Sequence, residues 1–554
     1  ATALDFNGTV AISGNTTIED GADLITATAG TDNVRLGEGA GDTIASGAEN
    51  NVTIGKNAGT AITTGDRNIA IGTSALLAED AHGKNIAIGH SALSSLDAGT
   101  DGLNVVVGDI AGQNMSTGTE SVLVGSSAGN ALTTGDRNVA IGRKALFSDT
   151  VGSRSVAVGY HSLENQNYTT ATSNYNVAVG YSAGNDITTG IQNTILGALA
   201  ADTLVDAHGN TAVGYTALTA DTEGNYSTAI GYGTLQAQNF TTNTTSHNVA
   251  VGYASGNDIT TGQYSALFGS GTGAKLTDAD NNTALGSHAL NSDVLGSRST
   301  AVGFETLKNQ NFTTATNSEN VAVGYQAGLD LTTAQYSTFV GAFAGSNVTT
   351  GDYNTAIGRY ALLSNQTGQY NTVVGANAGD ALTTGNYNVA IGYSALSSED
   401  EHGSNVAIGR QALENQNAGA EAYNVAIGSL AGGAVTSGIR NNFIGGLAGD
   451  ALTTGNYNVA NGYAALSGDT AGSTAVAVGY QALVAQNFST AVSNYNVAVG
   501  FGTGQSITTG INNTLLGGAA GDALTDADYN VALGAFSLST DTLGSRAVAV
   551  GYGA

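Results

Sequence analysis

One glycine returns along this chain at a nearly constant spacing. It closes the frame Asn-(Val/Ile/Thr)-Ala-(Ile/Val)-Gly, first at Gly55 and last at Gly551. The 29 marker glycines define 28 intervals, of which 22 are 17 residues long, four are 21 and two are 19. A fixed period in this range means that each repeat is one small unit that must stack on its neighbours to bury its apolar side chains. The sequence therefore predicts an all-β fold, a parallel β-roll or β-solenoid of about 29 coils.

The residues before each marker glycine have the pattern of a strand. Side chains alternate in direction along a strand, so Ile86 and Ile88 share one face and Ala87 and Gly89 share the other. We expect the Ile/Val row to form the core, because β-branched apolar residues favour a buried, pleated surface. Four residues before the marker, Asn occurs at 21 of the 29 positions and Ser at six. This predicts a ladder of stacked amides.

A slower pattern of four repeats is superimposed on the 17-residue period. Four residues after the marker, most of the chain carries Leu in two successive repeats and Gly in the next two, and each long interval follows the second Leu. The cycle slips once, where Gly345, Leu362, Gly379 and Leu396 alternate singly. In the repeat after each long interval, the usual Ala two residues before the marker is replaced by a bulky residue. These bulky residues are Leu123, Ile195, Leu267, Phe339, Phe443 and Leu515. The three signals share one phase and define a 72-residue superperiod.

Composition agrees with one extended repeat domain. The chain has 80 Gly and no Pro, which a continuous β-ladder tolerates poorly, and it has no Cys, so thiolate metal sites and thiol nucleophiles are excluded. We expect a cap or joining segment over residues 1–36 and a repeat domain over residues 37–554. The net charge of −28 disfavours binding to nucleic acid or anionic lipid. No apolar stretch approaches the ~20 residues of a membrane helix, so no membrane insertion is predicted.

Catalytic and metal-binding patterns are scarce in this sequence. The seven His residues lie in turns or just after a marker glycine, with no two at metal-ligand spacing. Residues 37–44 are similar to a calcium-binding nonapeptide repeat, but that pattern requires tandem copies and occurs here once and imperfectly. We therefore predict that the protein is not an enzyme and that it uses no cofactor and no metal.

The long intervals provide the best candidates for ligand contact. Five of the six share a Gln-Asn pair, usually followed by an aromatic residue, and loops on a rigid scaffold are where binding groups tend to lie. The candidate residues are Asn165, Gln166, Asn167, Tyr168, Gln238, Asn239, Phe240, Gln310, Asn311, Phe312, Gln416, Asn417, Gln486, Asn487 and Phe488. Amides beside a ring suit a sugar. Alternatively, the Gln-Asn pair closes the loop on its own backbone and the ring packs against a neighbouring subunit.

Residues 138–142 and 388–396, which both begin Asn-Val-Ala-Ile-Gly, resemble the head repeats of trimeric autotransporter adhesins, and the likeness covers about residues 37–554. The resemblance implies a left-handed parallel β-roll, three chains packed side by side, and a role in attachment. The commonest head repeat of that family is shorter than the one found here. Residues 354–362 are also similar to repeats of bacteriophage tail-fibre proteins.

These observations lead us to expect an extracellular trimeric fibre with a structural shaft and an attachment role, on a virion surface as in a tail fibre. The alternative is the passenger head of a bacterial trimeric autotransporter adhesin, on the bacterial cell surface. The expected partners are two further copies of the chain, as a homotrimer, and a cell-surface glycan or protein receptor. We expect the Ala face to form the trimer contact, with the bulky residues from Leu123 to Leu515 filling a common axis. At ~4.8 Å per strand, 29 coils would make a rod of roughly 140 Å.

Overall fold

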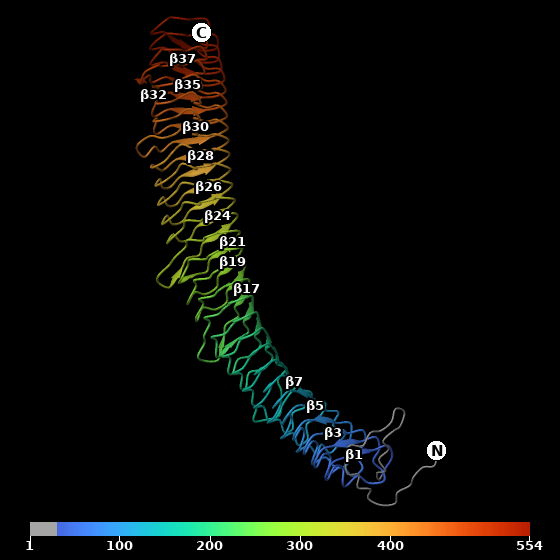
Figure 1. Ribbon diagram of the computed structural model, residues 1–554. Helices are drawn as coiled ribbons and strands as arrows, with labels where there is room; N and C mark the ends of the chain where they lie inside the picture. Colours follow the sequence, from blue (N-terminus) through green and yellow to red (C-terminus); the bar gives the residue numbers. More distant parts are fainter. Residues whose placement is uncertain (1–29) are drawn as a thin grey trace, which may run out of the picture. The chain divides into compact units, whose positions relative to one another are not determined.

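The computed structural model describes residues 30–554, which contain 38 β-strands and no helix. These residues fall into two compact units, residues 30–208 and residues 209–554. In each unit the chain winds as a parallel β-solenoid with one three-residue strand per coil (Figure 1). The predicted fold class, an all-β parallel solenoid with a 17-residue repeat, is confirmed, and the structure has about 30 coils.

The strands of the first unit share one length and one register. They are β1 (Val34–Leu36), β2 (Val52–Ile54), β3 (Ile69–Ile71), β4 (Ile86–Ile88), β5 (Val105–Val107), β6 (Val122–Val124), β7 (Val139–Ile141), β9 (Val156–Val158), β11 (Val177–Val179) and β12 (Thr194–Leu196). From β1 to β11, each of these strands pairs in parallel with the strand of the next coil, one repeat away in sequence, and Ala140 for example lies opposite Ala157. This register places equivalent residues of successive coils above one another.

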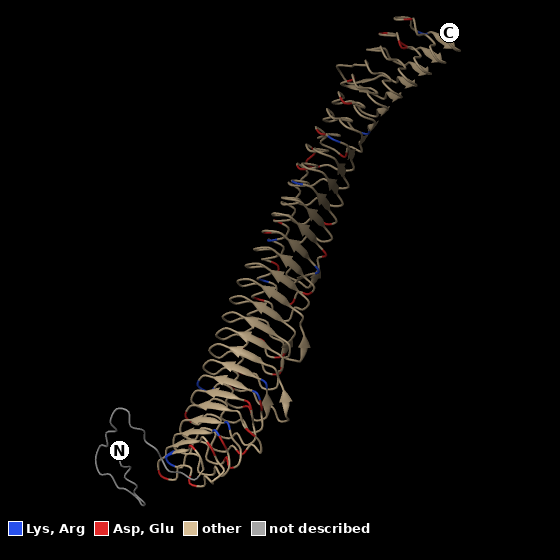
Figure 2. Cartoon of the chain, turned by 90° about the vertical axis from the view of Figure 1, so that its right-hand side faces the viewer, with Lys and Arg blue, Asp and Glu red and all other residues tan. Residues whose placement is uncertain are grey.

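The second unit continues the same pattern. Its three-residue strands are β13 (Thr211–Val213), β15 (Thr228–Ile230), β17 (Val249–Val251), β18 (Ala266–Phe268), β19 (Thr283–Leu285), β21 (Thr300–Val302), β23 (Val321–Val323), β24 (Thr338–Val340), β25 (Thr355–Ile357), β26 (Thr372–Val374), β27 (Val389–Ile391), β28 (Val406–Ile408), β29 (Val425–Ile427), β30 (Asn442–Ile444), β31 (Val459–Asn461), β33 (Val476–Val478), β35 (Val497–Val499), β36 (Thr514–Leu516), β37 (Val531–Leu533) and β38 (Val548–Val550). Figure 2 shows these strands stacked in columns.

The four 21-residue intervals each add a small two-stranded parallel sheet beside the main strands. The pairs are β8 (Gly152–Ser153) with β10 (Thr172–Ser173), β14 (Gly224–Asn225) with β16 (Thr244–Thr245), β20 (Gly296–Ser297) with β22 (Thr316–Asn317), and β32 (Gly472–Ser473) with β34 (Val492–Ser493). The inserted residues of a long interval therefore pair with the coil before it.

The core lies on the opposite side of the strand from the one predicted, so that prediction is wrong. Ala87, at the centre of its strand, is fully buried, whereas Ile86 and Ile88 are only half-buried and point outward. The interior of a 17-residue coil is narrow, and the strand residue shares it with side chains from the rest of the same coil. Close packing therefore selects a small residue at the strand centre and moves the β-branched residues outside.

The bulky exceptions follow from the same packing. Leu123 is fully buried, and a Cβ atom added at Gly112 or Gly129 would lie 2.9 Å from its side chain. One bulky strand residue thus fills the space of two coils, and those coils carry Gly, or Ala201 in the coil of Ile195, where the others carry Leu. This explains why Leu and Gly alternate in pairs. Phe339 and Phe443 are likewise buried within one chain, so the prediction that these residues fill a common trimer axis is wrong.

The predicted amide ladder is confirmed. The backbone N–H of Asn371 donates to Oδ1 of Asn354 (3.0 Å), and the N–H of Asn388 donates to Oδ1 of Asn371 (3.0 Å). Each of these side chains is buried. Asn371 also donates from Nδ2 to the backbone oxygen of Gly385 (2.8 Å), which closes the turn before the next strand. The ladder satisfies backbone groups that the narrow coil hides from water.

The predicted N-terminal segment lies mostly outside the described residues, which begin at residue 30. Within it, Val34–Leu36 form strand β1, which pairs in parallel with β2. No helix long and apolar enough to span a membrane occurs in the part of the chain that the structure describes.

Candidate interaction surface

Within each unit, the outward side of the strands forms one surface, which we call the strand face. It comprises four rows of residues, each defined by its position relative to the marker glycine. The two central rows lie three residues and one residue before that glycine. The two flanking rows lie five residues before it and one residue after it. In one coil these are Tyr387, Val389, Ile391 and Tyr393. Val389 and Ile391 are half-buried, while Tyr387 and Tyr393 are 63% and 54% exposed. The strand face is therefore apolar at its centre and aromatic at both edges.

Nearly all tyrosines of the chain lie on the flanking rows. Of 23 Tyr residues, 21 occupy them, and all 21 are exposed. The aromatic residues of the first flanking row are Tyr175, Tyr226, Tyr264, Tyr336, Tyr353, Tyr370, Tyr387, Tyr423, Tyr457, Tyr495 and Tyr529. Those of the second are Tyr160, Tyr181, Tyr215, Tyr232, Tyr253, Phe304, Tyr325, Tyr393, Tyr463, Tyr480, Phe501 and Tyr552. A concentration of exposed rings on one face marks a surface suited to protein contact.

Rings of successive coils stack on one another. The ring centroids of Tyr353 lie 4.9 Å from those of both Tyr336 and Tyr370, and Tyr370 lies 5.2 Å from Tyr387. The rings are within 12° of parallel. This spacing is close to the ~4.8 Å separation of hydrogen-bonded strands, so the backbone register imposes the stacking. The stacked rings present a regular, preorganised surface to any partner.

The backbone of the first flanking row is strained for any residue other than glycine. Tyr353, Tyr370 and Tyr387 all have a φ of 58°, in the left-handed region, and of the 30 residues at this position only Gly209 is a glycine. A non-glycine residue costs about 1–2 kcal/mol there. The same left-handed φ recurs at fully buried positions such as Leu76 (49°) and Leu93 (50°), so this strain belongs to the geometry of the coil and does not by itself mark a functional surface.

Charge is also divided between the strand face and the remaining surface. Within residues 30–554, the two flanking rows carry 11 of the 15 Lys and Arg residues but only five of the 39 Asp and Glu residues, a net charge of +6. The basic residues are Lys56, Arg67, Lys84, Arg137, Arg143, Arg154, Arg298, Arg359, Arg410, Arg440 and Arg546. All other positions in residues 30–554 together carry −30. The acidic surface predicted from composition therefore excludes the strand face.

Arginine and tyrosine contact each other along the flanking rows. Arg143 donates to the hydroxyl of Tyr160 (2.7 Å), one coil away, and its guanidinium lies 5.5 Å from the ring centroid. Arg440 contacts Tyr457 in the same way, with a hydrogen bond of 2.8 Å. These cation–π contacts hold the basic side chains flat over the aromatic rows.

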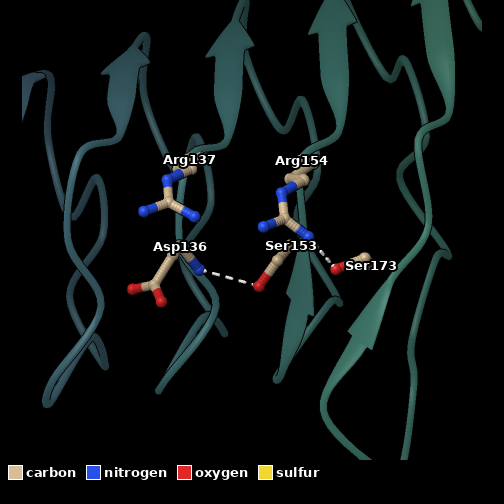
Figure 3. Close-up of a pocket in the computed structure, with 5 residues that line it drawn as sticks. All are labelled: Asp136, Arg137, Ser153, Arg154 and Ser173. Atoms are coloured by element: carbon tan, nitrogen blue, oxygen red, sulfur yellow. Dashed lines mark hydrogen bonds between the residues drawn. The ribbon is translucent and has the colours of Figure 1, made fainter.

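A small polar pocket borders the strand face beside β8 and β10. Asp136, Arg137, Ser153, Arg154 and Ser173 line it, and the two guanidinium groups come from successive coils (Figure 3). The N–H of Asp136 donates to Oγ of Ser153 (3.0 Å), and Arg154 donates to Oγ of Ser173. A corresponding pocket lies beside β32 and β34 in the second unit.

The candidate residues of the long intervals divide between the interior and the surface. Gln166 is fully buried: Nε2 donates to Oδ2 of Asp149 (2.7 Å), and Oε1 accepts from Asn176 (2.9 Å). The other Gln residues and all four rings are buried as well: Gln238, Gln310, Gln416, Gln486, Tyr168, Phe240, Phe312 and Phe488. The exposed members are Asn165, Asn167, Asn239, Asn311, Asn417 and Asn487. A ligand-contact role therefore stays a prediction for these asparagines alone.

The buried glutamines reveal a set of acids that the sequence patterns did not identify. Asp149, Asp221, Asp293 and Asp469 stand seven residues after their marker, each in the coil before a 21-residue interval, and all are fully buried. Each accepts a hydrogen bond from the Gln of the next coil, at 2.5–2.7 Å. An acid followed by Gln one coil later, in a column where most coils carry an apolar residue, was the available signal. We call these four the anchor aspartates, because they tie each inserted segment to the preceding coil.

Burial raises the pKa of three anchor aspartates. Burial removes these carboxyl groups from water and disfavours their charged form. The pKa values of Asp149, Asp221 and Asp293 are therefore raised above the ordinary value of an aspartate. Hydrogen bonds from the Gln side chain and from backbone N–H groups oppose the shift without cancelling it.

No protein-family model matches this chain, and a search of curated proteins finds no significant relative. The interpretation of function therefore depends on the repeat pattern and on the strand face.

Proposed function

We propose that this chain forms the shaft of an extracellular fibre with an attachment role, and that three copies assemble through their strand faces. The observation that carries the proposal is the stripe of exposed Tyr and half-buried Val and Ile residues along the strands. In a single chain this stripe faces water. Burying it against further copies would gain roughly 25 cal/mol for each Å² of apolar area removed from water.

The composition of the strand face supports a protein partner. Tyrosine and arginine are the residue types enriched at the energetic centres of protein interfaces, and stacked rings lose little conformational entropy on binding. The −30 charge on the remaining positions keeps the assembled particle soluble and limits lateral association. The sequence pattern predicts a trimer contact on the Ala side of the strands. In the proposed trimer, the contact lies on the Val/Ile side instead.

A tail fibre of a virion is the first candidate, and the passenger head of a bacterial adhesin is the alternative. Both place the chain outside the cell, and both use a trimeric shaft to present a surface to a glycan or protein receptor. Binding of the purified protein to bacterial cells favours the tail fibre, whereas binding to host cells or matrix favours the adhesin. No catalytic role is proposed.

The assembly is tested by the mass of the particle in native buffer, measured by analytical ultracentrifugation. We expect the full chain to sediment with three times the single-chain mass of 54.9 kDa. The combined variant Ile357→Lys, Val374→Lys and Ile391→Lys places three charges on one central row in successive coils, and we expect it to sediment as a single chain. A charge buried in an interface without a partner costs several kcal/mol.

A matched control carries the same charges elsewhere. Thr350, Thr367 and Thr384 are exposed and belong to the same three coils, but they lie outside the strand face. Changing these three residues to Lys should leave the trimer intact. A single-chain mass for the unmodified protein excludes the trimer, and a trimer that survives the strand-face variant excludes the strand face as its interface.

A further inference from the structure

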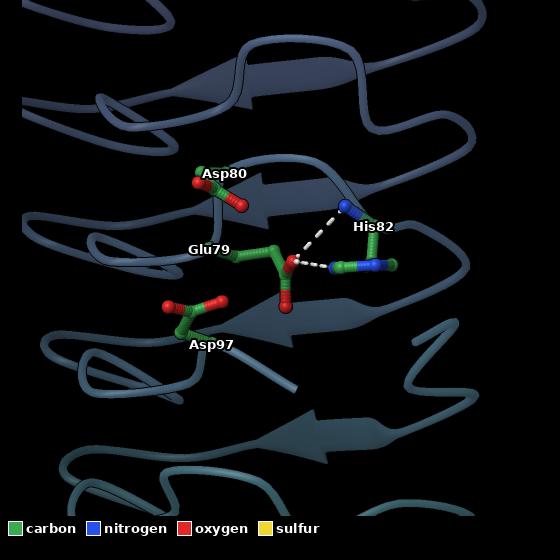
Figure 4. Close-up of side chains that lie close together, drawn as sticks. All are labelled: Glu79, Asp80, His82 and Asp97. Atoms are coloured by element: carbon green, nitrogen blue, oxygen red, sulfur yellow. Dashed lines mark hydrogen bonds and ion pairs between the residues drawn. The ribbon is translucent and has the colours of Figure 1, made fainter. Parts of the chain in front are cut away.

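Two segments far apart in sequence share the pattern Glu-Asp-x-His-Gly. They are residues 79–83 and 399–403, and each lies in the coil directly before a 19-residue interval. In the first, the side chains of Glu79, Asp80 and His82 lie close to Asp97 of the next coil (Figure 4). One potential ligand atom from each residue lies within 4.8 Å of the others. Glu399, Asp400 and His402 form the corresponding group in the second unit.

The glutamate of each cluster is buried and incompletely hydrogen-bonded. Glu79 is fully buried; Oε1 accepts from the backbone N–H of His82 (3.1 Å), whereas Oε2 has no hydrogen-bond partner among the described residues. Glu399 repeats this arrangement with the N–H of His402 (3.2 Å) and an unpartnered Oε2. A buried carboxylate oxygen without a partner is costly, so its recurrence indicates a missing ligand.

The anchor aspartates show that hydrogen bonds from the protein alone can satisfy a buried acid seven residues after the marker glycine. Asp149 occupies the same position as Glu79, and it accepts from Gln166 (2.7 Å) and from the N–H of Gly152 (3.0 Å). In the coil after Glu79, the residue at the position of Gln166 is Leu96, which cannot donate a hydrogen bond. Gln416 stands at that position after Glu399, but its Nε2 has no hydrogen-bond partner within residues 30–554. The two glutamates therefore lack the donor that every anchor aspartate has.

The histidine ring in each cluster points at the glutamate from just beyond hydrogen-bonding distance. Nδ1 of His82 lies 3.6 Å from Oε1 of Glu79, and Nδ1 of His402 lies 3.7 Å from Oε1 of Glu399. Neither nitrogen has a hydrogen-bond partner within the described part of the chain. Two ligands about 2.0–2.1 Å from a tetrahedral metal ion lie about 3.4 Å apart. The observed spacing therefore suits a shared cation better than a direct hydrogen bond.

We propose that each cluster binds one divalent transition-metal ion, of the Zn²⁺ type, through a buried glutamate, a histidine Nδ1 and the neighbouring aspartate. Imidazole together with carboxylates favours Zn²⁺ over Ca²⁺ or Mg²⁺, which take mainly oxygen ligands. The first site has Asp97 as a fourth ligand, and Asn417 stands at the equivalent position in the second. The first site should therefore bind more tightly.

The metal would replace the anchor that the 19-residue intervals lack. Asp97 keeps the regular register with Ser116 and directly precedes the extra residues of one such interval, so a cation held between Asp97 and Glu79 would join the start of that loop to the coil before it. This is the role that Gln166 and Asp149 have in a 21-residue interval. The inference concerns the coils themselves and does not depend on the proposed trimer.

The test is titration of the chelator-treated full chain with Zn²⁺, followed by isothermal calorimetry and by thermal melting. We expect two tight sites in the unmodified chain, one tight site in His82→Ala or in His402→Ala, and no tight site in the double variant. The affinity of each altered site should fall at least ~100-fold. We also expect Zn²⁺ to raise the melting temperature of the unmodified chain and not that of the double variant. His288→Ala is the control, because His288 is an exposed histidine outside both clusters.

A second pair of variants separates binding from folding. Glu79→Gln and Glu399→Gln preserve side-chain volume and remove the charge, and each should lose its tight site while the folded chain keeps its β-sheet circular dichroism. Tight Zn²⁺ binding that persists in the double histidine variant overturns the proposal. So does tight binding of Ca²⁺ in the absence of tight Zn²⁺ binding, which would indicate a site made of oxygen ligands.

Discussion

The inward orientation of the central strand residue can be tested by moving a bulky side chain from that position to the neighbouring interior position four residues after the marker glycine. Phe443 fills the interior at β30, and a Cβ atom added at Gly449 would lie 2.6 Å from its ring. One coil later, Ala460 and Leu466 occupy the same two positions, and both are buried. The double variant Phe443→Ala, Gly449→Leu therefore converts one observed packing arrangement into the other.

The expected magnitudes follow from the buried volume and the backbone. Phe443→Ala leaves a large cavity and should cost about 3–5 kcal/mol. Gly449→Leu should cost about 1–3 kcal/mol from overpacking, plus about 1–2 kcal/mol because φ at Gly449 is 58°. In the double variant the leucine enters the cavity, so we expect its cost to be about 3 kcal/mol below the sum of the single costs.

Native-state hydrogen exchange is the appropriate assay, because a long solenoid need not unfold in one step. The amides of β30 and β31 report local opening, and 3 kcal/mol corresponds to roughly a 100-fold change in their exchange rate. Ile444→Ala is the matched control, measured like the other variants in the single-chain form that carries the three strand-face Lys substitutions, because the proposed trimer buries the strand face. In that form Ile444 is the next residue of the same strand but points outward, so its replacement should cost far less than that of Phe443. Additive costs for the two single variants, or equal costs at Phe443 and Ile444, would refute the inward assignment.

Three further outcomes are expected. Asn371→Ala should lose about 1–3 kcal/mol of local stability, because it leaves buried N–H and C=O groups unpaired. Asn371→Ser should lose less, because a serine oxygen can still accept in the ladder, and native-state hydrogen exchange of the neighbouring strand amides measures both. For the anchor aspartates whose pKa is raised by burial, the folded chain retains protons that the unfolded chain releases above about pH 4. This part of the stability is therefore greatest below that pH and is lost as pH rises through the folded pKa. The melting temperature should fall as pH rises above about 4, and replacing the three aspartates by Asn should reduce that fall. Finally, Gln310→Ala should destabilise the fold by about 1–3 kcal/mol, whereas Asn311→Ala should change stability by less than 0.5 kcal/mol and lower attachment if the exposed asparagines bind a receptor.

The period of the chain was sufficient to predict the solenoid. A 17-residue return of Asn and Gly, with one strand-like triplet between them, is compatible with few folds other than stacked parallel coils, since each repeat is too short to bury itself. The amide ladder followed from the same period, because register stacks Asn371 on Asn354 whatever the handedness or curvature of the coil.

The buried side of the strand could not be read from the triplet alone. Hydrophobicity favours Ile86 and Ile88 over Ala87 as core, and only the width of the coil reverses that choice. The same applies to Gln166. It is a polar residue of the kind found in surface loops, but its side chain donates to a buried carboxylate in the preceding coil. Contacts between successive coils join residues about 17 positions apart, so local patterns do not contain them.

The sequence by itself therefore determined the repeat, the all-β class and the stacking register, because these depend on spacing along one chain. Only the tertiary structure decided which face is inside, which of the long-interval residues reach the surface, and that Glu79 and Glu399 lack the donor supplied to Asp149. Those features depend on the volume enclosed by a coil and on hydrogen bonds between coils. A periodic pattern specifies the arrangement of the coils, but the space within them decides where each side chain lies.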